Sequence, residues 1–151
     1  MRNKEDAKEN DMEALLRLCA MKHFVKLKQS VSGYQFTIEG YQSSYEKLLD
    51  QFSEESMSFT NSRIEEYKES LTAFLELFQI SNKQSSKVAL LESFYVVFEK
   101  VGIRKPITVK TYNCILNNET YKANVRQGTV KLKSMNERWK TVYEIWSGAD
   151  H

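Results

Sequence analysis

Proline and glycine are scarce in this chain of 151 residues, which contains one proline and five glycines. β-Sandwiches and β-barrels need many such residues at their turns, so this scarcity favours a fold made of long helices. No apolar run approaches the ~18 residues of a membrane-spanning helix, and the charged N-terminal stretch does not resemble a signal peptide. We therefore expect a cytoplasmic protein that has no membrane partner.

Histidine and cysteine, which hold metals in many proteins, occur only twice each. Cys19 and Cys114 are far apart and fall on helical patterns, which predicts two reduced, buried thiols. His23 has no second histidine at metal-binding spacing, and His151 is the last residue. The glycines are scattered singly, so the sequence has no glycine-rich phosphate loop. We expect no metal and no cofactor, and the lack of converging titratable residues favours a non-catalytic role.

Aromatic residues, in contrast, are plentiful: eight Phe, eight Tyr and two Trp. Together with apolar residues at spacings of three and four, they predict an all-α single domain, an irregular bundle of six or seven helices. Its centre is the nearly unbroken apolar segment at about 86–101, because a helix that is apolar all round has to be enclosed by others. Glu92 in that segment is expected to face solvent or the helix dipole. The domain covers 1–151, with frayed ends at about 1–9 and 148–151.

Apolar stripes and turn residues place the other helices. Gly102 has the position of a residue that ends the central helix, and Pro106 fits the first turn of the next one. Trp139 and Trp146 share an apolar face of the last helix, which favours core packing with basic neighbours reaching around them to solvent; stacking on nucleic-acid bases is the alternative. The expected helices cover 10–23, 41–52, 61–78, 108–116, 118–126 and 132–146, with breaks at 30–33, 81–86 and 128.

Charge is distributed unevenly along the chain, although the net charge at pH 7 is only +2. Residues 39–76 contain nine acidic and three basic residues, whereas residues 99–140 contain ten basic and three acidic residues. Such asymmetry is typical of a nucleic-acid-binding face, of two halves that attract each other, or of ordinary solvated helices. The candidate nucleic-acid-binding residues are Arg104, Lys105, Lys110, Lys122, Arg126, Lys131 and Lys133.

One pair of residues has a catalytic spacing. Arg17 and His23 are separated by five residues, which matches the loose Arg-x(4–6)-His motif of the HEPN ribonucleases, a helical family in which the pair lies across a dimer cleft and acts on RNA. Here Leu18 follows the arginine, where that family usually has a polar residue, and the pair lies in the first helix rather than late in the chain. An HEPN-like ribonuclease is one alternative; the other is a solvated arginine and a helix-end histidine.

Two segments resemble the C-terminal helical part of the GmrSD-type restriction proteins. Residues 10–24, Asn-Asp-Met-Glu-Ala-Leu-Leu-Arg-Leu-Cys-Ala-Met-Lys-His-Phe, are similar to a family helix in which an acidic residue precedes a Leu-x-Leu-Arg-Phe-like run. The second segment, from 86 to 98, is similar to the family's Asn-Lys-Ala-Leu-Phe-Glu helix, with Lys87, Ala89, Leu90, Leu91 and Glu92 at the matching places. Between these two segments, residues 64–78 correspond to a family helix that often ends in phenylalanine. The stretch from 128 to Arg138 looks like the closing helices of the family.

In that family a ParB-like first domain, marked by an Asp-Gly-Gln-Gln-Arg motif, acts in a nucleotide-dependent way, and a separate HNH domain cuts modified or foreign DNA. Neither motif occurs in this sequence, so no catalytic residue is carried over. The resemblance implies a non-catalytic helical module of a restriction or antiphage system that contributes DNA contacts or domain assembly. Its implied partners are DNA and a ParB-like, NTP-hydrolysing domain or subunit. A protein–protein interaction or dimerisation module of another pathway, including a homodimer, is the alternative.

Overall fold

A computed structural model of the protein describes residues 4–31, 33–79, 87–126 and 130–148, with side chains from residue 12 onward. In this part of the chain the protein is mostly helical, but it also contains two small sheets, so the expected all-α class is too strict. The elements are α1 (Lys4–Phe24), β1 (Val25–Ser30), β2 (Gly33–Ile38), α2 (Tyr45–Ser56), α3 (Asn61–Leu75), β3 (Phe78–Gln79), α4 (Val88–Val96), the π-helical turn η2 (Val97–Val101), β4 (Ile107–Thr108), α5 (Val109–Leu116), α6 (Glu119–Arg126) and α7 (Leu132–Ser147).

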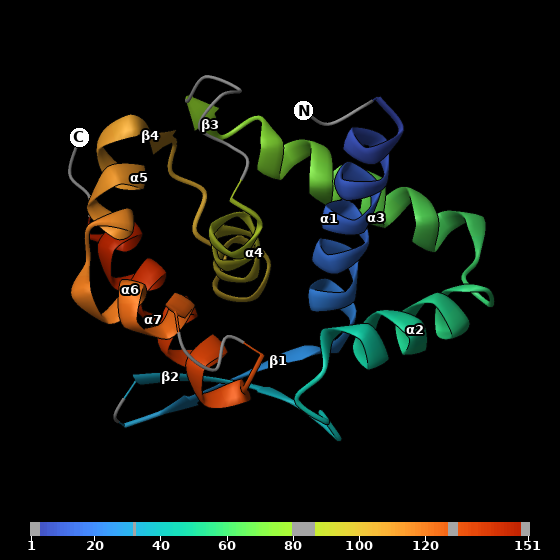
Figure 1. Ribbon diagram of the computed structural model, residues 1–151, viewed down its shortest axis with the longest axis horizontal. Helices are drawn as coiled ribbons and strands as arrows, with labels where there is room; N and C mark the ends of the chain where they lie inside the picture. Colours follow the sequence, from blue (N-terminus) through green and yellow to red (C-terminus); the bar gives the residue numbers. More distant parts are fainter. Residues whose placement is uncertain (1–3, 32, 80–86, 127–129, 149–151) are drawn as a thin grey trace.

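The predicted central helix is at the centre of the structure. Helix α4, continued by η2, lies between α1, α2 and α3 on one side and α5, α6 and α7 on the other (Figure 1). Leu90, Phe94 and Phe98 are fully buried, as a helix that is apolar nearly all round requires. Gly102 ends the helical segment in the left-handed conformation, with φ of 91°, and so confirms the predicted C-terminal glycine.

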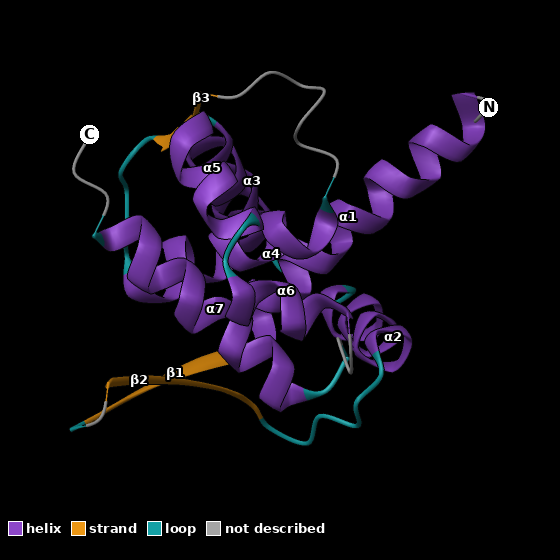
Figure 2. Ribbon diagram, turned by 60° about the vertical axis from the view of Figure 1, so that its left-hand side comes forward, coloured by secondary structure: helices purple, strands orange, loops and turns teal. Residues whose placement is uncertain are grey.

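The largest departure from the predicted fold is an antiparallel hairpin. Strands β1 and β2 pair from Val25↔Ile38 to Ser30↔Gly33, and the break expected at 30–33 is the turn between them. Alternation of polar and apolar residues through this stretch is the period-two pattern of strands. Gly33, with φ of 118°, provides the left-handed residue at the turn. The hairpin forms an outer layer that helices cover on one side (Figure 2).

Several helix boundaries also differ from the expected ones. Helix α2 begins at Tyr45 rather than at 41, because the Oγ of Ser44 accepts a hydrogen bond from the backbone N–H of Lys47 and caps the helix. Pro106 does not enter a helix: β4 follows it and pairs in parallel with β3. Of the ends expected to fray, residues 4–9 belong to α1 and Gly148 follows α7, while 1–3 and 149–151 lie outside the described residues, as do the break at 128 and the connector at 81–86.

The core contains both tryptophans of the last helix, as predicted. Trp139 and Trp146 are fully buried. Arg138 is also fully buried, so the expectation that basic neighbours reach around the tryptophans to solvent is wrong at this position. The expectation of two buried thiols is wrong as well, since Cys19 is half-buried and Cys114 is exposed; both are free. Among the described residues, no helix is both long and apolar enough to cross a bilayer.

Candidate functional site

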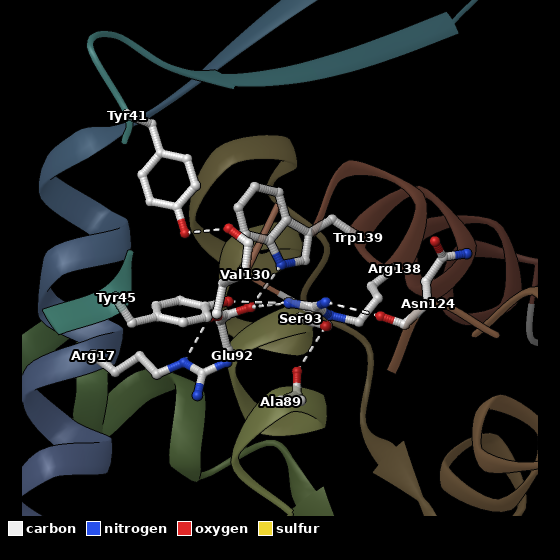
Figure 3. A network of polar contacts seen from close by, with 10 residues as sticks. All are labelled: Arg17, Tyr41, Tyr45, Ala89, Glu92, Ser93, Asn124, Val130, Arg138 and Trp139. Carbon is white, nitrogen blue, oxygen red and sulfur yellow. Dashed lines mark hydrogen bonds and ion pairs between the residues drawn. The ribbon is translucent and has the colours of Figure 1, made fainter. Parts of the chain in front are cut away.

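The most distinctive polar site is a buried ion cluster around Glu92. Its carboxylate has no solvent exposure, and Oε1 accepts a hydrogen bond of 2.7 Å from the Nε of Arg17. Oε2 accepts hydrogen bonds from a terminal guanidinium nitrogen of Arg138 at 3.3 Å and from the indole Nε1 of Trp139 at 3.0 Å (Figure 3). We call Arg17, Tyr45, Glu92, Arg138 and Trp139 the Glu92 cluster. It joins α1, the start of α2, α4 and α7.

Burial explains why so many donors converge on one carboxylate. An isolated ionised carboxylate in the core would lose its hydration at large cost, and paired guanidinium groups offset that cost. Burial by itself would lower the pKa of Arg17, but attraction to Glu92 and Tyr45 outweighs it, so that pKa lies above its ordinary value. Arg138 has a further hydrogen bond of 3.1 Å to the carbonyl oxygen of Asn124. The cluster is therefore a charged link between helices.

The charges of this cluster act on two tyrosines, Tyr45 within it and Tyr41 beside it. The ring of Tyr45 lies under the Arg17 guanidinium, 4.0 Å from ring centroid to Cζ, and its hydroxyl accepts a hydrogen bond of 3.0 Å from Arg138. Burial, followed by repulsion from Glu92, raises the pKa of Tyr45. The same causes raise the pKa of Tyr41 to about 12, and its hydroxyl donates to the carbonyl oxygen of Val130. Both phenols therefore stay neutral at physiological pH.

The geometry of the Glu92 cluster suits structure rather than catalysis. Glu92 and Arg138 are each 0% exposed, so a substrate has no access to either group. A general acid or base has to reach the atom whose proton it moves, which these enclosed side chains do not. Expecting Glu92 at solvent or as a helix-dipole residue was wrong. Local spacing offers no signal for this position, because the partners Arg17 and Arg138 lie 75 and 46 positions away.

A second polar site is centred on His23 at the end of α1. Its Nε2 lies 3.1 Å from the Oε1 of Glu55, and its Nδ1 lies 3.3 Å from a guanidinium nitrogen of Arg63 and 3.4 Å from the hydroxyl of Tyr67. Because a guanidinium can only donate, this geometry assigns an unprotonated Nδ1 and an Nε2–H that donates to Glu55. An open hollow of about 370 Å³ beside them is lined by His23, Glu55, Ser58, Phe59, Thr60 and Arg63.

The structure does not bring Arg17 and His23 together. Arg17 contacts Glu92 and Tyr45, whereas His23 contacts Glu55, Arg63 and Tyr67. The HEPN-like alternative needs both side chains at one RNA-binding cleft, and Arg17 is already bound to a buried carboxylate. No observation in the described residues favours that alternative.

The seven candidate nucleic-acid-binding residues are distributed over the segment before β4, α5, α6 and the start of α7 rather than gathered in one patch. The Nζ of Lys105 donates to the carbonyl oxygen of Ser147 at the end of α7, while Lys131 precedes the start of that helix and Lys133 lies in its first turn. A helix of 16 residues spans ~24 Å. The other four candidates are Arg104, Lys110, Lys122 and Arg126. The guanidinium of Arg104 lies over the ring of Phe98, and the ammonium group of Lys122 pairs with the carboxylate of Glu119.

Exposed charge is nonetheless divided between two sides of the molecule. Helices α2 and α3 lie opposite α5, α6 and α7, with α4 between them (Figure 1). The acidic side carries Glu46, Asp50, Glu54, Glu55, Glu65, Glu66 and Glu69, all exposed. The basic candidates lie on the other side, in or beside α5, α6 and α7. The asymmetry along the sequence is thus also an asymmetry in space.

Within the described residues, no group of three or more His, Cys, Asp or Glu side chains has a geometry that could hold a metal ion. Comparison of the chain with models of protein families, with curated proteins and with solved structures finds no match.

Proposed function

We propose that this chain is a non-catalytic helical module of a GmrSD-like restriction or antiphage protein, and that it contributes contacts to duplex DNA. In this proposal the module has no chemical step of its own. It holds DNA beside a ParB-like, NTP-hydrolysing domain or subunit, which supplies the chemistry.

The observation that carries the proposal is that the family-like segments meet at one buried point. Arg17 belongs to the first segment, Glu92 to the second and Arg138 to the closing segment, and both guanidinium groups bind the carboxylate of Glu92. Apolar helix patterns recur in unrelated proteins, but a buried ion cluster requires a particular residue at each of three distant places. The contact supports the view that these segments form one architecture.

The spatial division of charge supports DNA as the ligand. Phosphates attract exposed lysine and arginine side chains, and such contacts are largely independent of sequence. Lys110, Lys131 and Lys133 are exposed, and within the described part of the chain no hydrogen bond or ion pair engages their ammonium groups. These three residues are therefore available for phosphate contacts along the α5–α7 side.

The test is fluorescence anisotropy with a short labelled DNA duplex of random sequence at a series of salt concentrations. We expect micromolar binding at low salt and a linear fall of log K with log salt concentration, with a slope of about −0.9 for each phosphate contacted. The triple variant Lys110→Ala, Lys131→Ala and Lys133→Ala should bind more weakly and have a shallower slope.

The matched control replaces lysines on the acidic side. Lys47 and Lys68 are exposed on α2 and α3, so the variant Lys47→Ala, Lys68→Ala removes the same kind of charge far from the proposed surface. It should bind DNA as well as the unaltered protein, or better. Absence of duplex binding at low salt would remove the DNA-binding part of the proposal. A loss in the control that is proportional to the charge removed, two lysines against three, would show that net charge alone is responsible.

A dimerisation module is the second candidate, favoured by the free end of α1. The N-terminal part of this helix extends away from the rest of the molecule (Figure 2), and Met12 and Leu15 on it are 71% and 45% exposed. Two such residues three positions apart lie on one helix face. Sedimentation velocity over a range of concentrations should show a dimer that Leu15→Asp abolishes. A monomer at every concentration would exclude this candidate.

A further inference from the structure

The β1–β2 hairpin has two chemically different faces. Alternate residues of a strand point to opposite sides, and directly paired residues point to the same side. The pairs Leu27↔Phe36 and Gln29↔Tyr34 therefore share the inner face. The ring of Phe36 makes an edge contact with Trp139, with centroids 5.6 Å apart, and the ring of Tyr34 makes one with Tyr143 at 4.9 Å. The inner face is thus fixed to α7.

The outer face is polar and basic. It carries the pairs Lys26↔Thr37 and Lys28↔Gln35, and none of the helices that the structure describes covers it (Figure 2). Lys26, Lys28 and Gln35 are exposed. Lys26 lies 3.8 Å from a carboxylate oxygen of Glu39, but both side chains are largely exposed, so water weakens this pair. Val31, at the turn, is fully exposed.

Helix α7 holds the hairpin in a fixed position. The side-chain amide of Asn136 binds both backbone groups of Phe36: its Oδ1 accepts from the N–H at 3.2 Å, and its Nδ2 donates to the carbonyl oxygen at 2.7 Å. These are the groups that an additional strand would otherwise bind. Since Phe36 is also fully buried, the hairpin is anchored before any ligand arrives. Binding of a ligand would therefore cost little conformational entropy in the hairpin.

More positive charge lies along the β2 edge of the hairpin. An open hollow of about 340 Å³ lies beside the contact between β2 and the first half of α7, and Lys133 and Lys140 line it, together with Glu137. Two lysines therefore flank the hairpin, while two others project from its outer face. This arrangement combines a central polar ribbon with cations at its side.

We propose that the β1–β2 hairpin enters the major groove of duplex DNA, with Lys28 and Gln35 at the base edges and Lys133 and Lys140 at the flanking phosphates. The strands of a ribbon lie ~4.8 Å apart, and the ~12 Å major groove admits a two-stranded ribbon with its side chains. Lysine suits the N7 and O6 acceptors of guanine, glutamine suits adenine, and an apolar tip such as Val31 suits the methyl group of thymine. This inference rests on the proposed function and names the element that reads the DNA.

The experiment compares the unaltered protein with the ribbon variant Lys28→Ala, Gln35→Ala. The control variant, Gln42→Ala, Lys68→Ala, removes the same side-chain types from exposed positions at the acidic side. Dimethyl sulfate reports on both grooves, because it methylates guanine N7 in the major groove and adenine N3 in the minor groove. Duplex DNA of mixed sequence is treated with it, with and without each protein.

We expect the unaltered protein and the control variant to protect guanine N7 and to leave adenine N3 reactive. The ribbon variant should lose the N7 protection and bind at least about tenfold more weakly, because it lacks both side chains that contact the base edges. Double-stranded RNA of the same sequence should show no effect of the ribbon variant, because its major groove is too deep and narrow for side chains. Circular dichroism should show unchanged helix content, since the replaced residues are exposed.

Three outcomes would overturn the inference: protection of adenine N3, N7 protection that persists in the ribbon variant, or the same loss of affinity for RNA as for DNA. If duplex DNA binds but the ribbon variant behaves normally, only this inference fails and the proposed function stands. If no duplex binds, both fail. Lysines on an exposed ribbon also discourage pairing with other strands; if that is their role, the variant aggregates while its N7 protection remains.

Discussion

The guanidinium of Arg17 and the carboxylate of Glu92 lie 2.7 Å apart although 75 positions separate them in the chain. The same carboxylate receives Arg138 and Trp139 from α7, so one acidic side chain connects the first and last helices of the fold. Because this group is fully enclosed, its pairing should matter more to stability than that of any surface ion pair.

Replacing Glu92 with glutamine should destabilise the protein strongly. The variant Glu92→Gln keeps the shape but removes the counter-charge of the fully buried Arg138 and the partly buried Arg17, and we expect a loss of about 3–5 kcal/mol in the free energy of unfolding. Urea denaturation followed by circular dichroism measures it. The control Glu54→Gln, on the exposed face of α2, should stay within about 0.5 kcal/mol of the unaltered protein. Similar values for the two variants would contradict the structural role given to Glu92.

The two tryptophans of α7 offer a matched pair. Both are fully buried, but the Nε1 of Trp139 donates to Glu92, whereas the Nε1 of Trp146 has no hydrogen-bond partner among the described residues. Replacing either tryptophan with phenylalanine removes a similar side-chain volume from the core. Trp139→Phe should therefore cost about 1–3 kcal/mol more than Trp146→Phe, because it deprives a buried carboxylate of a donor. Equal losses in urea denaturation would show that packing alone determines both effects.

Acid should weaken the contact between α1 and η2. Burial would raise the pKa of Glu99, but hydrogen bonds from Lys22 and Ser70 outweigh it and hold the pKa below its ordinary value of 4.5. A carboxylate with a lowered pKa stabilises the folded state above pH 4.5, and that stability is lost as the pH falls through the folded-state pKa. Glu99→Gln should be less stable at neutral pH and lose less stability below pH 4.5, and Ser70→Ala should be intermediate. A decline as steep in Glu99→Gln as in the unaltered protein would exclude this assignment.

Alkali should act through the buried tyrosines. Burial and the nearby Glu92 carboxylate raise the pKa of Tyr41 to about 12 and raise that of Tyr45 as well. A raised pKa stabilises the folded state below the ordinary value of 10.0, and the stability is lost as the pH rises towards the folded-state value. Urea denaturation between pH 9 and pH 12 should show a decline that is smaller in Tyr41→Phe. Tyrosinate absorbance is the independent check: if Tyr41 in the folded protein ionises near pH 10, the explanation is wrong.

The sequence predicts the helices of this fold better than its connections. Stripes of apolar residues locate α3, α4, α6 and α7, because a helix face repeats every three or four residues. The hairpin was missed although residues 25–38 alternate, because few glycines and one proline weighed against any strand. One glycine, Gly33, is enough for a single hairpin, so composition limits large sheets but not small ones.

Charged residues were the harder part of the candidate site. Glu92 and Arg138 look like surface residues when each is considered alone, because single charged side chains are almost never buried. Their burial depends on each other and on Arg17, and partners 46 and 75 positions away cannot be derived from local spacing. The basic residues between 99 and 140 were easier to find, but their proximity in the sequence did not show that Lys105 and Lys131 lie at opposite ends of α7.

The order of the Glu92 partners along the chain also bears on biosynthesis. A ribosome completes Arg17 first, Glu92 next and Arg138 last, 46 positions after the carboxylate. Until α7 has been made, the nascent Glu92 lacks two of its three donors, and its hydration opposes closure of the core around α4. We therefore expect the core around α4 to close only after α7 has become available to pack against it.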